Sequence, residues 1–441
     1  MVHTSLCREQ IEKFRTEYEQ NPISRVAAKA ASKTSLEDIC YDTQRAAKMN
    51  HMFSVEVPTM AGTDQKASGR CWIFASLNVL REKIGKDLDL ENFELSQNYI
   101  AFYDHLEKAN TFLQRMIDTA EKPLDDRLVY TLLNLPVGDG GWWEYFVGIC
   151  SKYGVVPKEA MPETYQSEHS ESMNAVLNMQ LRKDAIQLRR AVAEGKCAED
   201  VQAMEDGMLA RVYNLLAVCL GDPPKTFDFE YVTRDGQYHA VRGLEPTAFY
   251  EKYIGCRLDD IVSIVNAPAE DFPYYKIYYT QGEESIYGAY QAKRLNLPMY
   301  EFKDAVLRQL KAGDLVWFVC DCDYFGSRSE GICDTGLYDY EGFLGLDLSM
   351  EKGDLLHTRQ CSLNHAMVLT GVNLVDGKPD KWKIQNSWGT ENGNKGYYIM
   401  SDAWFDRYVF TASIHKKYLT EAQRKCFDAQ AEMLPIWNIL A

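Results

Sequence analysis

The spacing of apolar residues changes from a helical to a strand-like pattern along this chain, and that change constrains the fold most. After Cys71, apolar residues recur in steps of four, three and four, which places them on one face of an α-helix. These residues are Ile73, Leu77, Leu80 and Ile84. From 261 to 418, short strand-like apolar runs predict mainly β-structure, interrupted by one helix at 302–310. The sequence therefore predicts an α+β protein with a helical part before a β part.

Cys71 lies at or just before the first turn of the predicted buried helix. Gly69 allows the backbone to turn sharply directly before it. The free amides and the dipole of a helix N-terminus favour thiolate over thiol, so Cys71 is a candidate nucleophile. Gln65, upstream, could donate an amide N–H to an oxyanion. This segment alone is equally compatible with an inert core cysteine.

Two segments far downstream favour the nucleophile. The run 364–372 predicts a strand with His365 at its start, and 382–389 predicts a second strand that includes Asn386 and ends in a turn at Gly389. The residues between them have turn chemistry, so we expect an antiparallel hairpin that brings Asn386 beside His365. The order Cys, His, Asn is that of papain-like proteases.

Several segments resemble the bleomycin hydrolase/aminopeptidase C family of papain-like cysteine peptidases. The resemblance is carried by QKASGRCWIF (65–74), NHAMVLTGV (364–372) and QNSWG (385–389). Further family-like segments follow in order from about Asp64 to the C-terminus, at 139–143, 152–157, 316–318, 337–341 and 396–402. The resemblance implies a papain-like fold in which a helical half and a β-barrel half enclose a cleft. It also implies a cysteine aminopeptidase of broad specificity that acts on peptides.

The resemblance and the chemistry of acyl transfer together assign roles to five residues. Cys71 is expected to be the nucleophile, and His365 the base and then the acid, the two resting largely as thiolate and imidazolium. Asn386 is expected to orient the imidazole ring, and Trp388 to shield that hydrogen bond from water and to lie among the substrate-binding residues. Gln65 and the backbone N–H of Cys71 are expected to form the oxyanion hole.

The glycine-rich segment 138–141 lets another backbone approach closely. By resemblance, Gly140 and Gly141 are expected to pair with the substrate backbone. Trp142 and Trp143 are expected to wall a pocket or to fill the core. No Lys-Ser or Lys-Thr pair follows these glycines, which disfavours a phosphate-binding loop.

In the resembled family the C-terminus lies in the cleft, where its carboxylate binds the α-ammonium of the substrate. The segment from Trp437 to Ala441 is about three residues shorter than the family leads us to expect, which corresponds to about 10 Å of extended chain. Our hypothesis is that Ala441 still anchors the substrate amine. The alternative is a wider cleft that makes the enzyme an oligopeptidase or endopeptidase.

The middle of the chain is expected to be an insertion. His365 lies 294 positions after Cys71, whereas minimal papain-like enzymes place the histidine roughly 130–150 residues downstream. The resemblance implies that this insertion joins protomers into a homohexameric ring; a lid on a monomer is the alternative. The expected organisation is 1–60 packing on the catalytic core, 61–160 as the helical half, 161–260 as the inserted subdomain, 261–420 as the β-barrel half, and 421–441 as a tail reaching the cleft.

Composition excludes several other classes of protein. A net charge of −16 argues against nucleic-acid binding. No apolar run reaches a signal peptide or a membrane span, so we expect a cytoplasmic protein. The twelve cysteines are expected to be reduced thiols. The spacing of Cys320, Cys322 and Cys333 is not that of a zinc site, so neither a metal nor another cofactor is expected. A catalytically silent ring-forming scaffold and a cysteine acyltransferase remain as alternatives.

Overall fold

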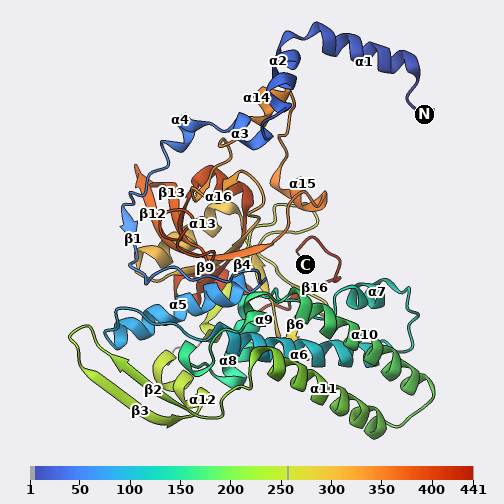
Figure 1. Ribbon diagram of the computed structural model, residues 1–441, viewed down its shortest axis with the longest axis vertical. Coiled ribbons are helices and arrows are strands. Elements are labelled where there is room, and N and C mark those ends of the chain that lie inside the picture. The colour runs from blue at the N-terminus through green and yellow to red at the C-terminus, as the bar shows by residue number, and fades with distance from the viewer. Residues whose placement is uncertain (1–4, 256–257, 441) are drawn as a thin grey trace.

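The computed structural model describes residues 5–255 and 258–440, which form a helical half and a β half (Figure 1). Two buried apolar cores hold them together: one lies mainly in the helical half and extends to β-half residues such as Trp317 and Val368, and the other lies in the β half. The helices of the first half are α5 (Cys71–Asp87), α6 (Gln97–Asp118), α7 (Arg127–Asn134), α8 (Trp143–Tyr153), α10 (Glu171–Ala193) and α11 (Ala198–Leu220). The predicted α+β class and the helical pattern after Cys71 are confirmed.

The β half is built on one twelve-stranded sheet. In spatial order its strands are β10 (Gly326–Ser327), β11 (Ile332–Cys333), β14 (Tyr397–Ser401), β13 (Lys378–Gln385), β12 (His365–Val375), β9 (Val316–Cys320), β15 (Val409–His415), β4 (Ile261–Val265), β8 (Arg294–Asn296), β5 (Ile277–Thr280) and β16 (Glu432–Leu434), with β1 (Val55–Glu56) paired to β12. The predicted helix at 302–310 lies within α13 (Met299–Lys311), which packs on this sheet.

The predicted hairpin between β12 and β13 is confirmed. The two strands pair antiparallel, with Val368 opposite Gln385, so Asn386 follows the last paired residue of β13 at the end of β12 that begins with His365. On its other side β12 pairs with β9, where His365 is opposite Cys320. These two neighbours fix the position of the histidine backbone.

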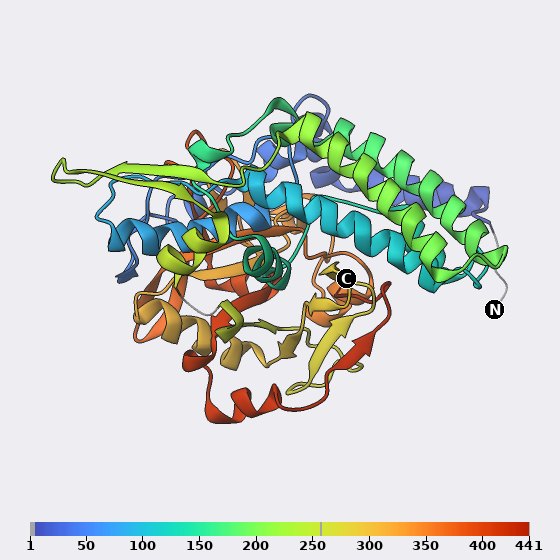
Figure 2. The same cartoon turned by 90° about the horizontal axis from the view of Figure 1, so that it is seen from below.

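The section 161–260, which the sequence predicts to be an insertion, packs along the helical half. Helices α10 and α11 lie beside α6 and form a layer of three long helices (Figure 2). A hairpin of β2 (Phe227–Val232) and β3 (Tyr238–Leu244) then extends from the body.

The start of the chain differs from the expectation that 1–60 packs on the catalytic core. Helices α1 (Arg8–Gln20) and α2 (Pro22–Ala31) have no buried residue and extend away from the body (Figure 1). Helix α2 contacts α14 (Tyr340–Leu344) of the β half, and the first buried residue of the described chain is Cys40 in α3 (Leu36–Cys40). Strand β1 then pairs with β12. Apart from the contact of α2 with α14, these two helices stay exposed, and none of their described residues belongs to either apolar core.

The end of the chain returns to the β half. Strand β16 adds to β5 in parallel, and Leu440 is fully buried. Ala441 lies outside the described residues. None of the helices in the described ranges combines the length and apolar character needed to cross a membrane.

Candidate active site

A cavity of about 520 Å³ lies between the two halves. The helical half contributes Cys71 and Trp72, and the β half contributes His365 and Ala366. Ile436, from the C-terminal segment, lines the same cavity. Residues that are hundreds of positions apart in the sequence therefore line the same cavity.

Helix α5 places Cys71 at its first residue. Its N-cap, Arg70, makes no side-chain capping hydrogen bond, so the first amides of the helix stay directed at the region of the thiol. The buried Sγ accepts a hydrogen bond from the backbone N–H of Ala366 at 3.4 Å. This contact brings the thiol of the helical half to the start of β12.

His365 and Asn386 form a buried hydrogen bond between Nε2 and Oδ1 at 2.8 Å. The Asn386 oxygen also accepts from the backbone N–H of Ser387 at 2.8 Å, which fixes the orientation of the amide. Because Oδ1 can only accept, Nε2 of His365 carries a proton. In the neutral ring, Nδ1 is therefore the nitrogen that can take a proton.

Trp388 covers one face of the His365 ring. The two rings are stacked with centroids 4.6 Å apart, and the guanidinium of Arg328 lies over the indole at 4.5 Å. The stacking restricts rotation of the imidazole and limits the access of water to its hydrogen bond with Asn386.

Burial acts against the thiolate–imidazolium pair that the sequence predicts. It raises the pKa of Cys71 to about 11, although hydrogen bonds from the backbone amides of Ala366, Trp72 and Cys71 itself lower it. Burial also lowers the pKa of His365 to about 4, with a smaller rise from Asn386 and a further lowering by Arg328. Burial therefore favours the uncharged pair, and proton transfer from thiol to ring creates two charges that then stabilise each other.

Gln65 lies behind the cavity and is held in one orientation. Its Nε2 donates to the Ser68 carbonyl at 2.6 Å, and its Oε1 accepts from the Ser387 hydroxyl at 2.7 Å. Because a carbonyl oxygen only accepts, the nitrogen must face Ser68. One of its two N–H groups is used there, which leaves the second for a ligand. Gln65 itself is not among the described residues that line the cavity.

Gly140 and Gly141 both line the cavity, and of the two Gly141 is the one that neighbouring atoms require to be glycine. A Cβ on Gly141 would lie 2.6 Å from the Trp72 ring, whereas a Cβ on Gly140 would have no described atom within 4 Å. The glycine at 141 thus allows the backbone to lie against Trp72, whereas position 140 has room for a Cβ. Trp142 lines the cavity, and Trp143 is fully buried.

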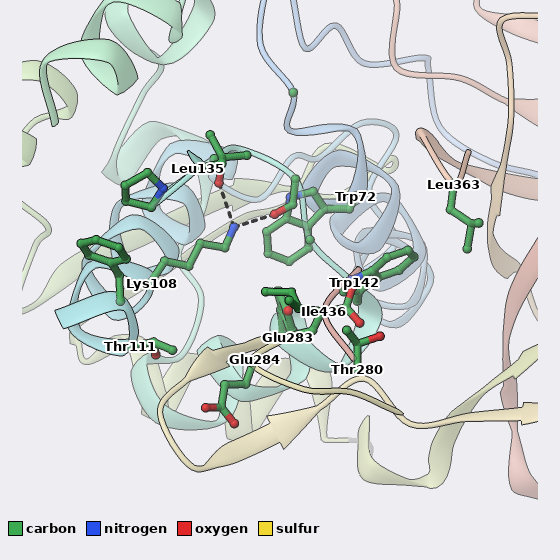
Figure 3. Close-up of a pocket in the computed structure, with 18 of the residues that line it drawn as sticks. Trp72, Lys108, Thr111, Leu135, Trp142, Thr280, Glu283, Glu284, Leu363 and Ile436 are labelled. Atoms are coloured by element: carbon green, nitrogen blue, oxygen red, sulfur yellow. Dashed lines mark hydrogen bonds between the residues drawn. The ribbon is translucent and has the colours of Figure 1, made fainter. Parts of the chain in front are cut away.

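Lys108 holds the glycine loop and was not identified from the sequence. Its Nζ donates to the carbonyls of Gly138 at 3.0 Å and Gly140 at 2.6 Å (Figure 3). It also pairs with Asp104 at 2.5 Å. The spacing of Asp104 and Lys108 by four residues on a helix is the only sequence signal for this pair. Nothing in the sequence indicates the contact with the loop, which is some thirty residues away.

The C-terminal segment forms part of the opposite wall. In Figure 3, Thr280, Glu283 and Ile436 lie together on the other side of the cavity from Lys108. The buried Arg294 pairs with Glu283 at 3.2 Å, and its Nη1 donates to the Leu440 carbonyl at 3.5 Å. The last described residue is thus tied to a cavity wall.

The whole described chain is similar to known peptidases. The model of the Peptidase C1-like family matches residues 5–441. The chain is 42% identical to aminopeptidase C of Lactobacillus delbrueckii subsp. lactis over 96% of this chain and 94% of that protein. It is 40% identical to aminopeptidase C of Listeria monocytogenes over 99% and 98%. A crystal structure of PepW from Lactobacillus rhamnosis superposes with a TM-score of 0.97 at 41% identity, over 99% of this chain and 98% of that one.

Proposed function

This chain belongs to the Peptidase C1-like family and is a papain-like cysteine aminopeptidase, and we propose how its own residues perform the reaction. Cys71 is the nucleophile, His365 the proton carrier and Asn386 the residue that orients the ring. The observation that carries this assignment is the shared cavity, in which the buried thiol contacts the start of β12 and His365 is already bound to Asn386.

The reaction proceeds by transfer of the thiol proton to Nδ1 of His365 as Sγ attacks the carbonyl carbon of the substrate. The second N–H of Gln65 and the backbone N–H of Cys71 stabilise the oxyanion; losing one such donor typically lowers the rate about 10²- to 10³-fold. His365 then gives the proton to the leaving amine, and the C–N bond breaks. Water, deprotonated by His365, releases the acyl group and restores the thiol.

We propose that Gly141 and the N–H of Gly140 pair with the substrate backbone. The carbonyl of Gly140 already accepts from Lys108, which leaves the amide as its stronger pairing group. Trp388 acts through His365 by covering the ring rather than by touching substrate.

The preference for a free N-terminus is proposed to come from the C-terminal segment. Leu440 is held by Arg294, and Asn438 donates to Thr280 at 3.0 Å, so the chain is directed along the cavity wall up to the last described position. A carboxylate at Ala441 would pair with the α-ammonium of the substrate. If the enzyme were instead an oligopeptidase, this pairing would be absent from the cleft.

We expect a dipeptide substrate with a free amine to be cleaved about 10- to 100-fold faster than its N-acetylated form. The reason is that a hydrogen bond between charged groups contributes about 1.5–3 kcal/mol. The measurement is kcat/KM for both substrates, repeated on a variant lacking Leu440 and Ala441, in which the ratio is expected to approach one. The matched control, Ala441→Gly, keeps a terminal carboxylate and should keep the ratio. Equal cleavage of both substrates by the intact enzyme would exclude the proposed anchor.

We further propose a cytoplasmic homohexamer. Helices α1 and α2 expose apolar side chains that a neighbouring protomer would cover, namely Ile11, Phe14, Tyr18, Ile23 and Val26. The inserted section adds an extended hairpin. Ten cysteines in the described ranges, leaving Cys150 aside, are free thiols, which suits a reducing compartment.

Light scattering of the full-length protein is expected to give about six times the protomer mass of 50.5 kDa. A variant that lacks residues 1–31 is expected to give a smaller assembly, because it loses both exposed helices. A monomeric mass for the intact protein would contradict the ring.

A further inference from the structure

His105, on α6, is a buried histidine outside the proposed catalytic residues. Its Nδ1 lies 2.8 Å from the Ala101 carbonyl oxygen. Its Nε2 lies 3.0 Å from Oδ1 of Asn174 and 3.3 Å from Oδ1 of Asp139. Both ring nitrogens therefore face oxygen atoms.

The orientation of Asn174 decides what those contacts mean. Its Nδ2 donates to Asp139 at 2.6 Å, so the amide oxygen is the atom that faces His105. Turning the amide over would place its oxygen against the Asp139 carboxylate, where neither group can donate. All three oxygens around the ring of His105 thus only accept hydrogen bonds, and each ring nitrogen must carry a proton.

Asp139 in turn holds the segment that contains the proposed nucleophile. Its Oδ2 accepts from the backbone N–H of Gly69 at 2.8 Å and from the hydroxyl of Ser170 at 2.5 Å. Its backbone carbonyl accepts from Nε1 of Trp72 at 2.6 Å. Asp139 therefore binds the chain on both sides of Cys71, and it directly precedes the glycines of the cavity wall.

The approach of Gly69 to Asp139 leaves no room for a side chain. A Cβ on Gly69 would lie 2.9 Å from the Cβ of Asp139. The glycine before the nucleophile is thus needed for this contact, beyond the turn for which the sequence predicts it.

We infer that His105 is an imidazolium in the working enzyme and forms with Asp139 a buried ion pair that positions the Cys71 segment against the glycine loop. This inference rests on the proposed role of Cys71. His105 and Asp139 are positioning residues, because neither lines the cavity among the described residues. The positive charge of His105 also offsets the carboxylate, which would otherwise oppose the formation of a thiolate at Cys71.

The electrostatic surroundings agree with this geometry. Burial opposes a charge on His105, but the hydrogen bond and charge of Asp139, together with Asp104, raise its pKa above the ordinary value; Lys108 acts in the opposite direction. Burial would raise the pKa of Asp139, and the contacts with His105, Ser170 and Gly69 lower it instead. From α10 and its N-cap residue, the cluster receives the uncharged Asn174 and Ser170.

The pair predicts a loss of activity on the alkaline side that does not originate in Cys71 or His365. A histidine whose pKa is raised by folding contributes its full stabilisation below the ordinary pKa of about 6.5 and loses it as the pH rises through the raised value. Above the raised pKa the ring of His105 loses one proton. One of its nitrogens is then a hydrogen-bond acceptor that faces another acceptor, and Asp139 loses its counter-ion.

The direct test is a neutron crystal structure of the full-length enzyme at neutral pH. We expect deuterons on both Nδ1 and Nε2 of His105. A single deuteron on the ring would overturn the inference. This readout requires no variant to fold and no peptidase activity, so it is independent of the proposed function.

The kinetic test uses His105→Gln, with His357→Gln as its matched control. His357 also contacts a carboxylate, Asp271 at 3.1 Å, but on the surface and away from the cavity. We expect His105→Gln to lower kcat about 10²-fold with little change in KM, because small misplacements of reacting groups have effects of this size. The pH at which kcat falls on the alkaline side of the pH profile should also change. The control should match the natural enzyme in both respects, and an unchanged alkaline limb in His105→Gln would contradict the inference.

A double-mutant cycle tests whether the two residues act as a unit. Asp139→Asn places an amide among groups that donate, so we expect a loss of kcat at least as large as that of His105→Gln. Combining both substitutions should cost little more than Asp139→Asn alone, because the interaction is already lost. Additive losses in kcat would overturn the pairing. If the natural enzyme itself lacked peptidase activity, the proposed function would fail while the neutron experiment still decided the protonation of His105.

Discussion

Replacing Cys71 with alanine is expected to lower kcat about 10⁶-fold. The substitution removes the sulfur that forms the acyl-enzyme and leaves the oxyanion donors and the cavity in place. Losses of this size follow the removal of a nucleophile that acts as a unit with its base. The residual rate should not respond to iodoacetamide, whereas the natural enzyme should be inactivated by it. Both can be measured with a free-amine dipeptide substrate.

Cys333→Ala is the matched control for this substitution. Cys333 is a buried free thiol in β11 that does not line the cavity, so its removal is expected to leave kcat within a few-fold of the natural value. The substitution should instead lower the melting temperature, because a small buried side chain is lost. Retention of peptidase activity by Cys71→Ala would eliminate Cys71 as the nucleophile and would restore the scaffold alternative.

Replacing His365 with alanine is expected to lower kcat about 10⁴- to 10⁶-fold. The lower bound follows from the pKa of about 11 that burial gives to Cys71. A thiol with that pKa is ionised to only about one part in 10⁴ at pH 7, and without His365 no neighbouring base takes its proton. The leaving amine also loses its proton donor.

The role of His365 can also be tested by measuring how the rate of Cys71 alkylation depends on pH in His365→Ala. Because alkylation requires the thiolate, its rate should rise about tenfold per pH unit as the pH approaches 11. In the natural enzyme His365 can take the proton, so the rate should depend much less on pH in this range. His357→Ala serves as the control. A rate in His365→Ala that is fast and independent of pH near neutrality would show that His365 does not control the ionisation of Cys71.

The sequence predicted those parts of the site that depend on local pattern. The helical spacing after Cys71 placed the thiol at the first residue of α5, and the turn residues after the first strand predicted the hairpin that joins His365 to Asn386. In both cases the decisive information lies within about twenty residues. The fold class followed from the same kind of pattern, because helical and strand-like spacing occupy different parts of the chain.

The features that the sequence did not predict depend on contacts between distant elements. His105 occupies an ordinary buried position on α6, and its protonation follows only from the orientation of Asn174 on another helix. Lys108 likewise looks in the sequence like any lysine on a helix, and its role follows only from its contact with the glycine-rich segment 138–141. The expected resting ion pair at Cys71 and His365 was inferred from residue types, whereas the degree of burial that opposes it is a property of the assembled cleft.

The thiol and the imidazole belong to different halves, and the apolar core around Cys71 extends across the join to Trp317 and Val319 of β9. Hydrogen bonds also cross the join, among them those from Nε1 of Trp317 to the backbone of Trp72 at 3.3 Å and from the Ser387 hydroxyl to Gln65 at 2.7 Å. A core substitution that leaves this join in place should therefore change stability more than the reaction. The sensitivity of peptidase activity to substitution should follow proximity to the join rather than depth below the surface.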